Sequence, residues 1–155
     1  MQHQIETADA ARTYLAAGNA VVTVVSRRTG RRYTYKVTAP GGRKRRYDAD
    51  VRHVAVLDGP SNEGDYAYLG VLVHGDGRYV HARKSPMDPR AGSSVAMRWL
   101  VRVLWGDSDT ADRHLGESVE VWHEGRCGRC GRRLTVPASI ASGLGPECAT
   151  KGPGR

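Results

Sequence analysis

The chain has 155 residues, of which 39% are hydrophobic and 26% are charged, and its formal net charge is +8. This composition is typical of a folded protein with a highly charged surface and excludes an intrinsically disordered chain. No run approaches the roughly 18 apolar residues of a membrane helix, and residues 1–10 lack the features of a secretory signal, so we expect a cytoplasmic protein.

A short helix and a β-hairpin are predicted at the beginning of the chain. The helix spans about residues 7–17, with Thr7 as a suitable N-cap. The pattern then changes to the two-residue alternation of strands at 21–26 and 32–37, on either side of a turn at 29–30. A hairpin with an exposed tip is therefore expected.

Three more strands and a second helix follow a turn-rich basic loop. The strands are predicted at 51–57, 66–73 and 78–82, and their short connections favour an antiparallel sheet. The helix, at about 94–105, can cover the apolar face of this sheet. Its apolar stripe is predicted to be core and comprises Val95, Trp99, Leu100, Val103 and Leu104.

The segment 106–116 is predicted to be a polar linker, and 118–123 a strand that leads into the segment with the cysteines. The fold class we expect is α+β, with an antiparallel sheet of about five strands, one or two helices and a small C-terminal module. The expected domains are a sheet domain at 1–117, the module at 118–150 and a flexible tail at 151–155.

The three cysteines have the spacing of a metal site. Cys127 and Cys130 are separated by two residues, which lets both sulfurs reach one ion, and neighbouring glycines permit a tight turn. Cys148 follows later, after a proline near the start of a short helix. Thiols stay reduced in the cytoplasm, so the sequence predicts a structural Zn²⁺ in a treble-clef-like module rather than a disulfide.

Structural zinc prefers four protein ligands, so three cysteines leave one position for another group. We choose His123, four residues before Cys127, which gives the pattern H-x3-C-x2-C-x17-C. His114, Glu124 or a water molecule are the alternatives for the fourth position. His123 could also be an ordinary surface histidine.

The run from His123 to Ala149, with Cys127-Gly-Arg-Cys130-Gly and Gly145-Pro-Glu-Cys148, closely resembles a small zinc-binding domain of unknown function that is common in bacteriophage and bacterial proteins. The preceding part, with Ser26-Arg-Arg-Thr-Gly30, looks like the body that often accompanies this domain in uncharacterised phage proteins. The resemblance implies a phage or prophage origin and a zinc ion, and it implies no activity.

Basic residues are concentrated in the segment 27–46, which contains no acidic residue. Such a cluster indicates a polyanionic partner, above all nucleic acid. Guanidinium groups bind phosphates, and Tyr33, Tyr35 and Tyr47 could stack on unpaired bases; the alternative is a solvated charge run with tyrosines in the core. The candidate nucleic-acid-binding residues are Arg27, Arg28, Arg31, Arg32, Arg43, Lys44, Arg45 and Arg46.

The sequence contains no paired carboxylates at an interpretable spacing, no nucleophile elbow, no phosphate loop and no nucleotide-binding fingerprint, so we do not expect an enzyme. The first functional hypothesis is a zinc-containing accessory protein that binds DNA or RNA. The second is a phage protein-interaction factor that binds and modulates a host nucleic-acid enzyme or defence complex. Neither hypothesis includes a membrane or a small-molecule cofactor.

Overall fold

The computed structural model describes residues 3–41, 50–61 and 64–150, so the predicted basic residues 43–46 and the predicted tail lie outside the described residues. In chain order the elements are β1 (His3–Ile5), α1 (Ala8–Leu15), β2 (Asn19–Ser26), β3 (Arg32–Thr38), β4 (Val51–Leu57), β5 (Tyr66–Val73), β6 (Arg78–His81), α2 (Gly92–Leu104), α3 (Ser108–Glu117), β7 (Val119–His123), α4 (Pro137–Ser142) and α5 (Pro146–Ala149).

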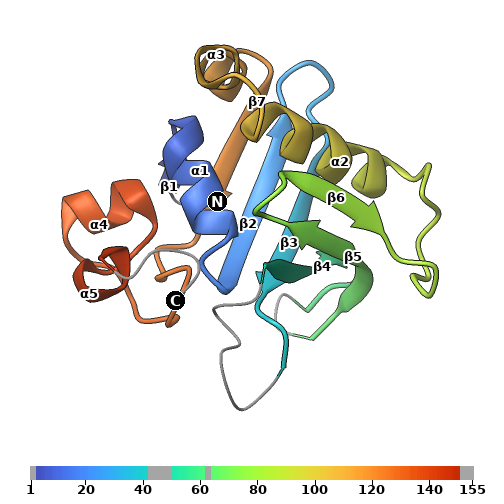
Figure 1. Ribbon diagram of the computed structural model, residues 1–155, viewed down its shortest axis with the longest axis horizontal. Coiled ribbons are helices and arrows are strands. Elements are labelled where there is room, and N and C mark those ends of the chain that lie inside the picture. The colour runs from blue at the N-terminus through green and yellow to red at the C-terminus, as the bar shows by residue number, and fades with distance from the viewer. Residues whose placement is uncertain (1–2, 42–49, 62–63, 151–155) are drawn as a thin grey trace.

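The strands form one antiparallel sheet in the order β1-β7-β2-β3-β4-β5-β6 (Figure 1). Consecutive strands from β2 to β6 are neighbours, as the short connections predict. The last strand in the chain, β7, lies between β1 and β2, where Val121 pairs with both Ile5 and Val24. The segment that leads into the cysteines is therefore part of the main sheet.

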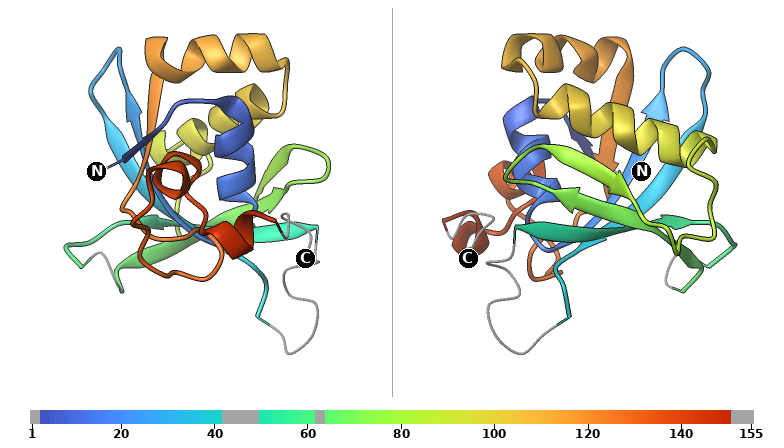
Figure 2. Two further views of the ribbon diagram at one scale, coloured as in Figure 1. Left: turned by 90° about the vertical axis from the view of Figure 1, so that its left-hand side faces the viewer. Right: turned by 45° about the vertical axis from the view of Figure 1, so that its right-hand side comes forward.

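The core lies between one face of this sheet and the helices α1, α2 and α3 (Figure 2). Strand alternation explains the buried face, because Val22, Val24, Tyr35 and Val37 are buried while most of their sequence neighbours, Thr23 excepted, are more exposed. The Tyr35 hydroxyl donates a hydrogen bond of 2.7 Å to the carbonyl of Ser93, which ties the sheet to the first turn of α2. No helix in the described part of the chain is long and apolar enough to cross a membrane.

The prediction of an α+β fold with an antiparallel sheet is confirmed, but the numbers of strands and helices were too low. The described residues contain seven strands and five helices. The expected linker at 106–116 is wrong, because most of it forms α3, whose N-cap Asp107 accepts a hydrogen bond of 2.9 Å from the Thr110 amide. Only Ala111 and Leu115 of this helix are buried, so its apolar pattern is weak.

The buried face of α2 also differs from the predicted stripe. Its buried apolar residues are Met97, Leu100, Val101 and Leu104, and the small Ser93 and Ser94 at the beginning of the helix are buried as well. Trp99 and Val103 are only half-buried, and 47% of Val95 is exposed. Part of the predicted core stripe is thus on the surface.

The C-terminal module packs against the end of α1. The Tyr14 ring lies against two glycines of the module, Gly128 and Gly143, at which an added Cβ would come within 2.7 and 2.4 Å of the ring. The Asn19 amide donates to the Gly128 carbonyl over 2.7 Å. A close approach without side chains at these two positions therefore holds the module on the body of the protein.

We predict that Gly143→Ala destabilises the protein more than Gly30→Ala does. Both glycines have a similar positive φ, 78° and 74°, so alanine introduces comparable backbone strain of about 1–2 kcal/mol at each. Only Gly143 would also clash with Tyr14, since nothing lies within 4 Å of a Cβ at Gly30. Overpacking adds about 1–3 kcal/mol to the loss in free energy of unfolding, measurable in urea. Equal losses would show that this contact does not hold the module.

Candidate functional site

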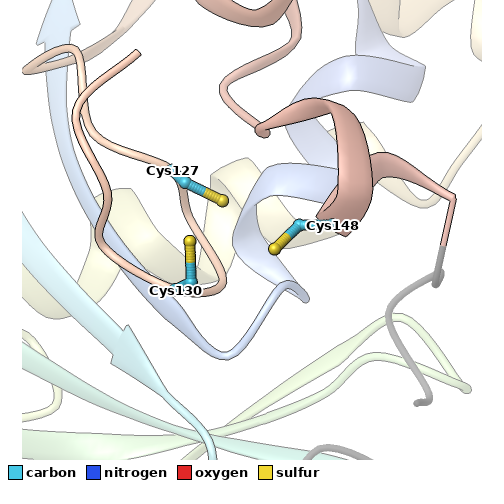
Figure 3. A group of neighbouring side chains, drawn as sticks. All are labelled: Cys127, Cys130 and Cys148. Atoms are coloured by element: carbon cyan, nitrogen blue, oxygen red, sulfur yellow. The ribbon is translucent and has the colours of Figure 1, made fainter.

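The three cysteine sulfurs come together at one point of the C-terminal module. The Sγ atoms of Cys127, Cys130 and Cys148 all lie within 4.8 Å of one another, close enough to hold a metal ion. Two of them come from the loop after β7 and the third from α5, and Figure 3 shows the three sulfurs directed into the same space. The metal-ligand spacing predicted from the sequence thus produces a cluster in space.

Main-chain hydrogen bonds shape the loop around Cys127. The Gly131 amide donates to the Cys127 carbonyl over 2.9 Å, and Gly131 has a φ of 78° that closes the turn. The amides of Arg129 and Gly145 donate to the Cys127 sulfur over 3.4 and 3.3 Å. The sulfur therefore lies in a nest of N–H groups that favours a thiolate.

These surroundings shift the two buried thiols in opposite directions. Burial acts to raise the pKa of Cys127, but main-chain hydrogen bonds from Cys130, Gly145 and Arg129 outweigh burial and lower the pKa to about 7. Burial and the two neighbouring sulfurs raise the pKa of Cys148 to about 11. Three thiolates this close repel one another, so full deprotonation of the cluster requires a bound cation.

His123 is not part of this cluster of ligand atoms. Its Nε2 lies 2.6 Å from the carbonyl of Ile140, which can only accept, and its Nδ1 lies 3.0 Å from the amide of Gly125, which can only donate. Both ring nitrogens of the neutral imidazole are therefore used, with the proton on Nε2. Burial lowers the pKa of His123, which favours the same neutral form.

These contacts give His123 a structural role, and its expected role as a metal ligand stays a prediction. It pairs with Val22 across the sheet and links the end of β7 to helix α4 of the module. Of the alternatives, His114 contacts Ser118 and Trp99 near the beginning of β7, whereas the cysteine loop follows the end of this strand. Exposed Glu124 lines a hollow next to Cys127, but like His123 it is outside the cluster of ligand atoms, and the fourth position of the site is left to one of these groups or to a water molecule.

The arginines of the predicted hairpin lie at the tip between β2 and β3. Arg27, Arg28, Arg31 and Arg32 are all exposed, and Arg27 forms an ion pair of 3.2 Å with Glu120 of β7. The expected stacking by Tyr35 is wrong, because this ring is completely buried. Tyr33 is half-buried and lines a hollow beside the hairpin.

This hollow, which we call the hairpin hollow, has a volume of about 660 Å³ and lies between the β2–β3 hairpin, α2 and the turn before β7. Its lining includes Arg28, Arg31, Tyr33, Val95, Ala96 and Trp99. The sequence did not identify Val95 or Trp99 as surface residues, because their helical spacing is equally typical of a buried face.

Comparison with known proteins finds a match only for the C-terminal module. Residues 121–151 match the model of a family of unknown function, DUF6011. The match includes all three cysteines and leaves most of the sheet outside. No curated protein and no solved structure is significantly similar to the chain.

We predict that His123→Phe lowers stability without lowering the metal content. The variant leaves the Gly125 amide and the Ile140 carbonyl without their partner, at a cost of about 1–3 kcal/mol for each buried group. Urea unfolding and elemental analysis of the purified protein measure the two quantities. Loss of the metal from a variant that is still folded by circular dichroism would instead identify His123 as a ligand.

Proposed function

We propose that the protein is a zinc-containing, nucleic-acid-binding accessory protein of the phage type that the sequence resembles. The observation that carries this proposal is the group of exposed guanidinium groups at the tip of the β2–β3 hairpin. Zinc supports the C-terminal module, and the hairpin contacts phosphates. The hypothesis that the chain is not an enzyme is part of this proposal.

The donor set fits zinc. Three soft thiolates favour zinc over magnesium or calcium, and a fourth ligand would complete the tetrahedral coordination of a structural site. The ion would join the loop after β7 to α5, two segments separated by α4. Its role in this proposal is to stabilise the fold, and the pairing of a knuckle with a cysteine on a helix supports a treble-clef-like arrangement.

The charges of the hairpin fit a phosphate backbone. In the described part of the chain, the side chains of Arg28 and Arg31 have no ion-pair partner, whereas Arg27 is neutralised by Glu120. An arginine without a carboxylate partner can bind phosphate without first breaking an ion pair. The basic residues 43–46, which lie outside the described residues, are proposed to contact phosphates as well.

A second candidate function is that of a protein-interaction factor directed at a host nucleic-acid enzyme or defence complex. The exposed side chain of Val95 beside the hairpin favours it, because apolar surface in a hollow also suits a protein side chain. Binding to generic oligonucleotides distinguishes the two candidates, since only the first requires it.

We predict that Cys130→Ser reduces bound zinc from one ion per chain toward none and loosens the module. Hydrogen exchange should increase at the amides of the loop, such as Gly131, while β2 and β3 stay protected. Arg132→Ser is the matched control, because it changes an exposed side chain of the same loop that is outside the cluster. Unchanged zinc content in Cys130→Ser would refute the proposed site.

We predict that the affinity for single-stranded DNA, duplex DNA or RNA falls steeply with salt, and that the double variant Arg28→Ser, Arg31→Ser binds more weakly. For single strands, the loss of two phosphate contacts should reduce the slope of log affinity against log salt by about 1.4. Fluorescence anisotropy at several salt concentrations measures this slope.

The control is the double variant Arg78→Ser, Arg83→Ser, which removes the same charge on and just after the edge strand β6. It should change affinity much less than the hairpin variant. Equal effects of the two variants would mean that total charge, and not the hairpin, determines binding. No binding by the wild-type protein at low salt would favour a protein partner.

A further inference from the structure

The hairpin hollow lies where the β2–β3 hairpin extends past β4. Strand β3 pairs with β2 from Arg32 to Thr38 but with β4 only from Tyr35 to Thr38. The tip of the hairpin therefore has no neighbouring strand on the β4 side, and α2 lies across from it (Figure 2). The space between the tip and α2 forms the hollow.

Two aromatic side chains, Tyr33 from the sheet and Trp99 from α2, line the hollow, and both are half-buried. Val24 and Val119 add apolar surface from the sheet, and Ala96 lies beside Trp99 on the helix. Aromatic and apolar walls of this kind bind planar, apolar groups. The volume of about 660 Å³ lies within the usual range of small-ligand sites, roughly 300–1,000 Å³.

The rim of the hollow carries the charge. Arg28 and Arg31 border it from the hairpin, and the Arg31 guanidinium comes within 3.9 Å of the position of a Cβ at Gly92, at the beginning of α2. Glu117 is the acidic residue of the lining. A ligand that fits must therefore present a planar apolar group to the interior and a negative charge to the arginine side.

We propose that the hairpin hollow binds an unpaired nucleobase of a single-stranded nucleic acid, with the adjacent phosphates at Arg28 and Arg31. This inference rests on the proposed nucleic-acid-binding function and specifies its ligand. A nucleotide combines the two required properties, because its base is flat and its phosphate is anionic. Stacking on Tyr33 or Trp99 needs an exposed base face, which a duplex does not offer. The protein therefore prefers single strands to duplexes.

The test compares the wild-type protein's affinity for a short oligothymidylate with its affinity for an abasic strand of the same length and charge. Base stacking should make the oligothymidylate bind about 5- to 150-fold more tightly. In Ala96→Leu, the longer side chain extends into the hollow beside Trp99 and narrows it without changing charge or helix propensity much, so this preference should fall. Tyr33→Leu, which removes a stacking ring and keeps both arginines, is a second variant.

Ala10→Leu is the control, because it makes the same change at a half-buried alanine of α1, outside the hollow, and should keep the preference for bases. Salt-dependent binding of both strands with equal affinity would overturn the base site and leave phosphate binding by the hairpin intact. Failure of both strands to bind at low salt would overturn the proposed function together with this inference. Binding only to an acidic peptide that contains tryptophan would assign the hollow to a protein partner and overturn the inference.

Discussion

The pairing of β7 between β1 and β2 is the interaction on which both candidate sites depend. At its end, His123 pairs with His3 and Val22, and the cysteine loop begins directly after it. At its beginning, Val119 pairs with Ser26, and the Ser118 carbonyl accepts a hydrogen bond of 3.0 Å from Arg27 at the base of the hairpin tip. The two ends of this five-residue strand are about 14 Å apart, because an extended chain rises about 3.4 Å per residue. One central strand thus positions the hairpin at one end and the thiols at the other.

A metal ion alone does not account for the position of the module. The module's own core consists of only a few buried side chains, including Leu134 and Leu144 beside two of the cysteines, which is too small to fold independently. It also needs the body of the protein, through the contact of Tyr14 with two glycines and the bridge from His123 to Ile140. The ion closes the loop, whereas packing and hydrogen bonds orient the module on the sheet.

Sequence patterns predicted the features that depend on neighbouring residues. The β2–β3 hairpin follows from alternation, and the clustering of the cysteines follows from their spacing. The sequence patterns failed where tertiary contacts determine which residues are buried. Helix α2 has apolar residues on two sides, and only packing buries the side with Met97 and Leu104 and leaves Val95 exposed. Spacing also could not predict that His123 joins the end of β7 to Ile140 of the module, because this hydrogen bond depends on tertiary contacts. The three-residue β1 carries too little pattern to be recognised, because its pairing with β7 is entirely long-range.

The exposed apolar side chains of α2 lie beside the β2–β3 hairpin and line the same hollow. Val95 is 47% exposed and Trp99 is only half-buried. Contact of these apolar side chains with water costs the protein part of the hydrophobic stabilisation that their burial would provide. The hairpin tip likewise gives up strand pairing on its β4 side. Both features border the same hollow, and two arginines without carboxylate partners among the described residues lie at its rim. A ligand that is flat and negatively charged would offset the exposed apolar surface and the unpaired charges together, because it covers the apolar wall and neutralises the arginines.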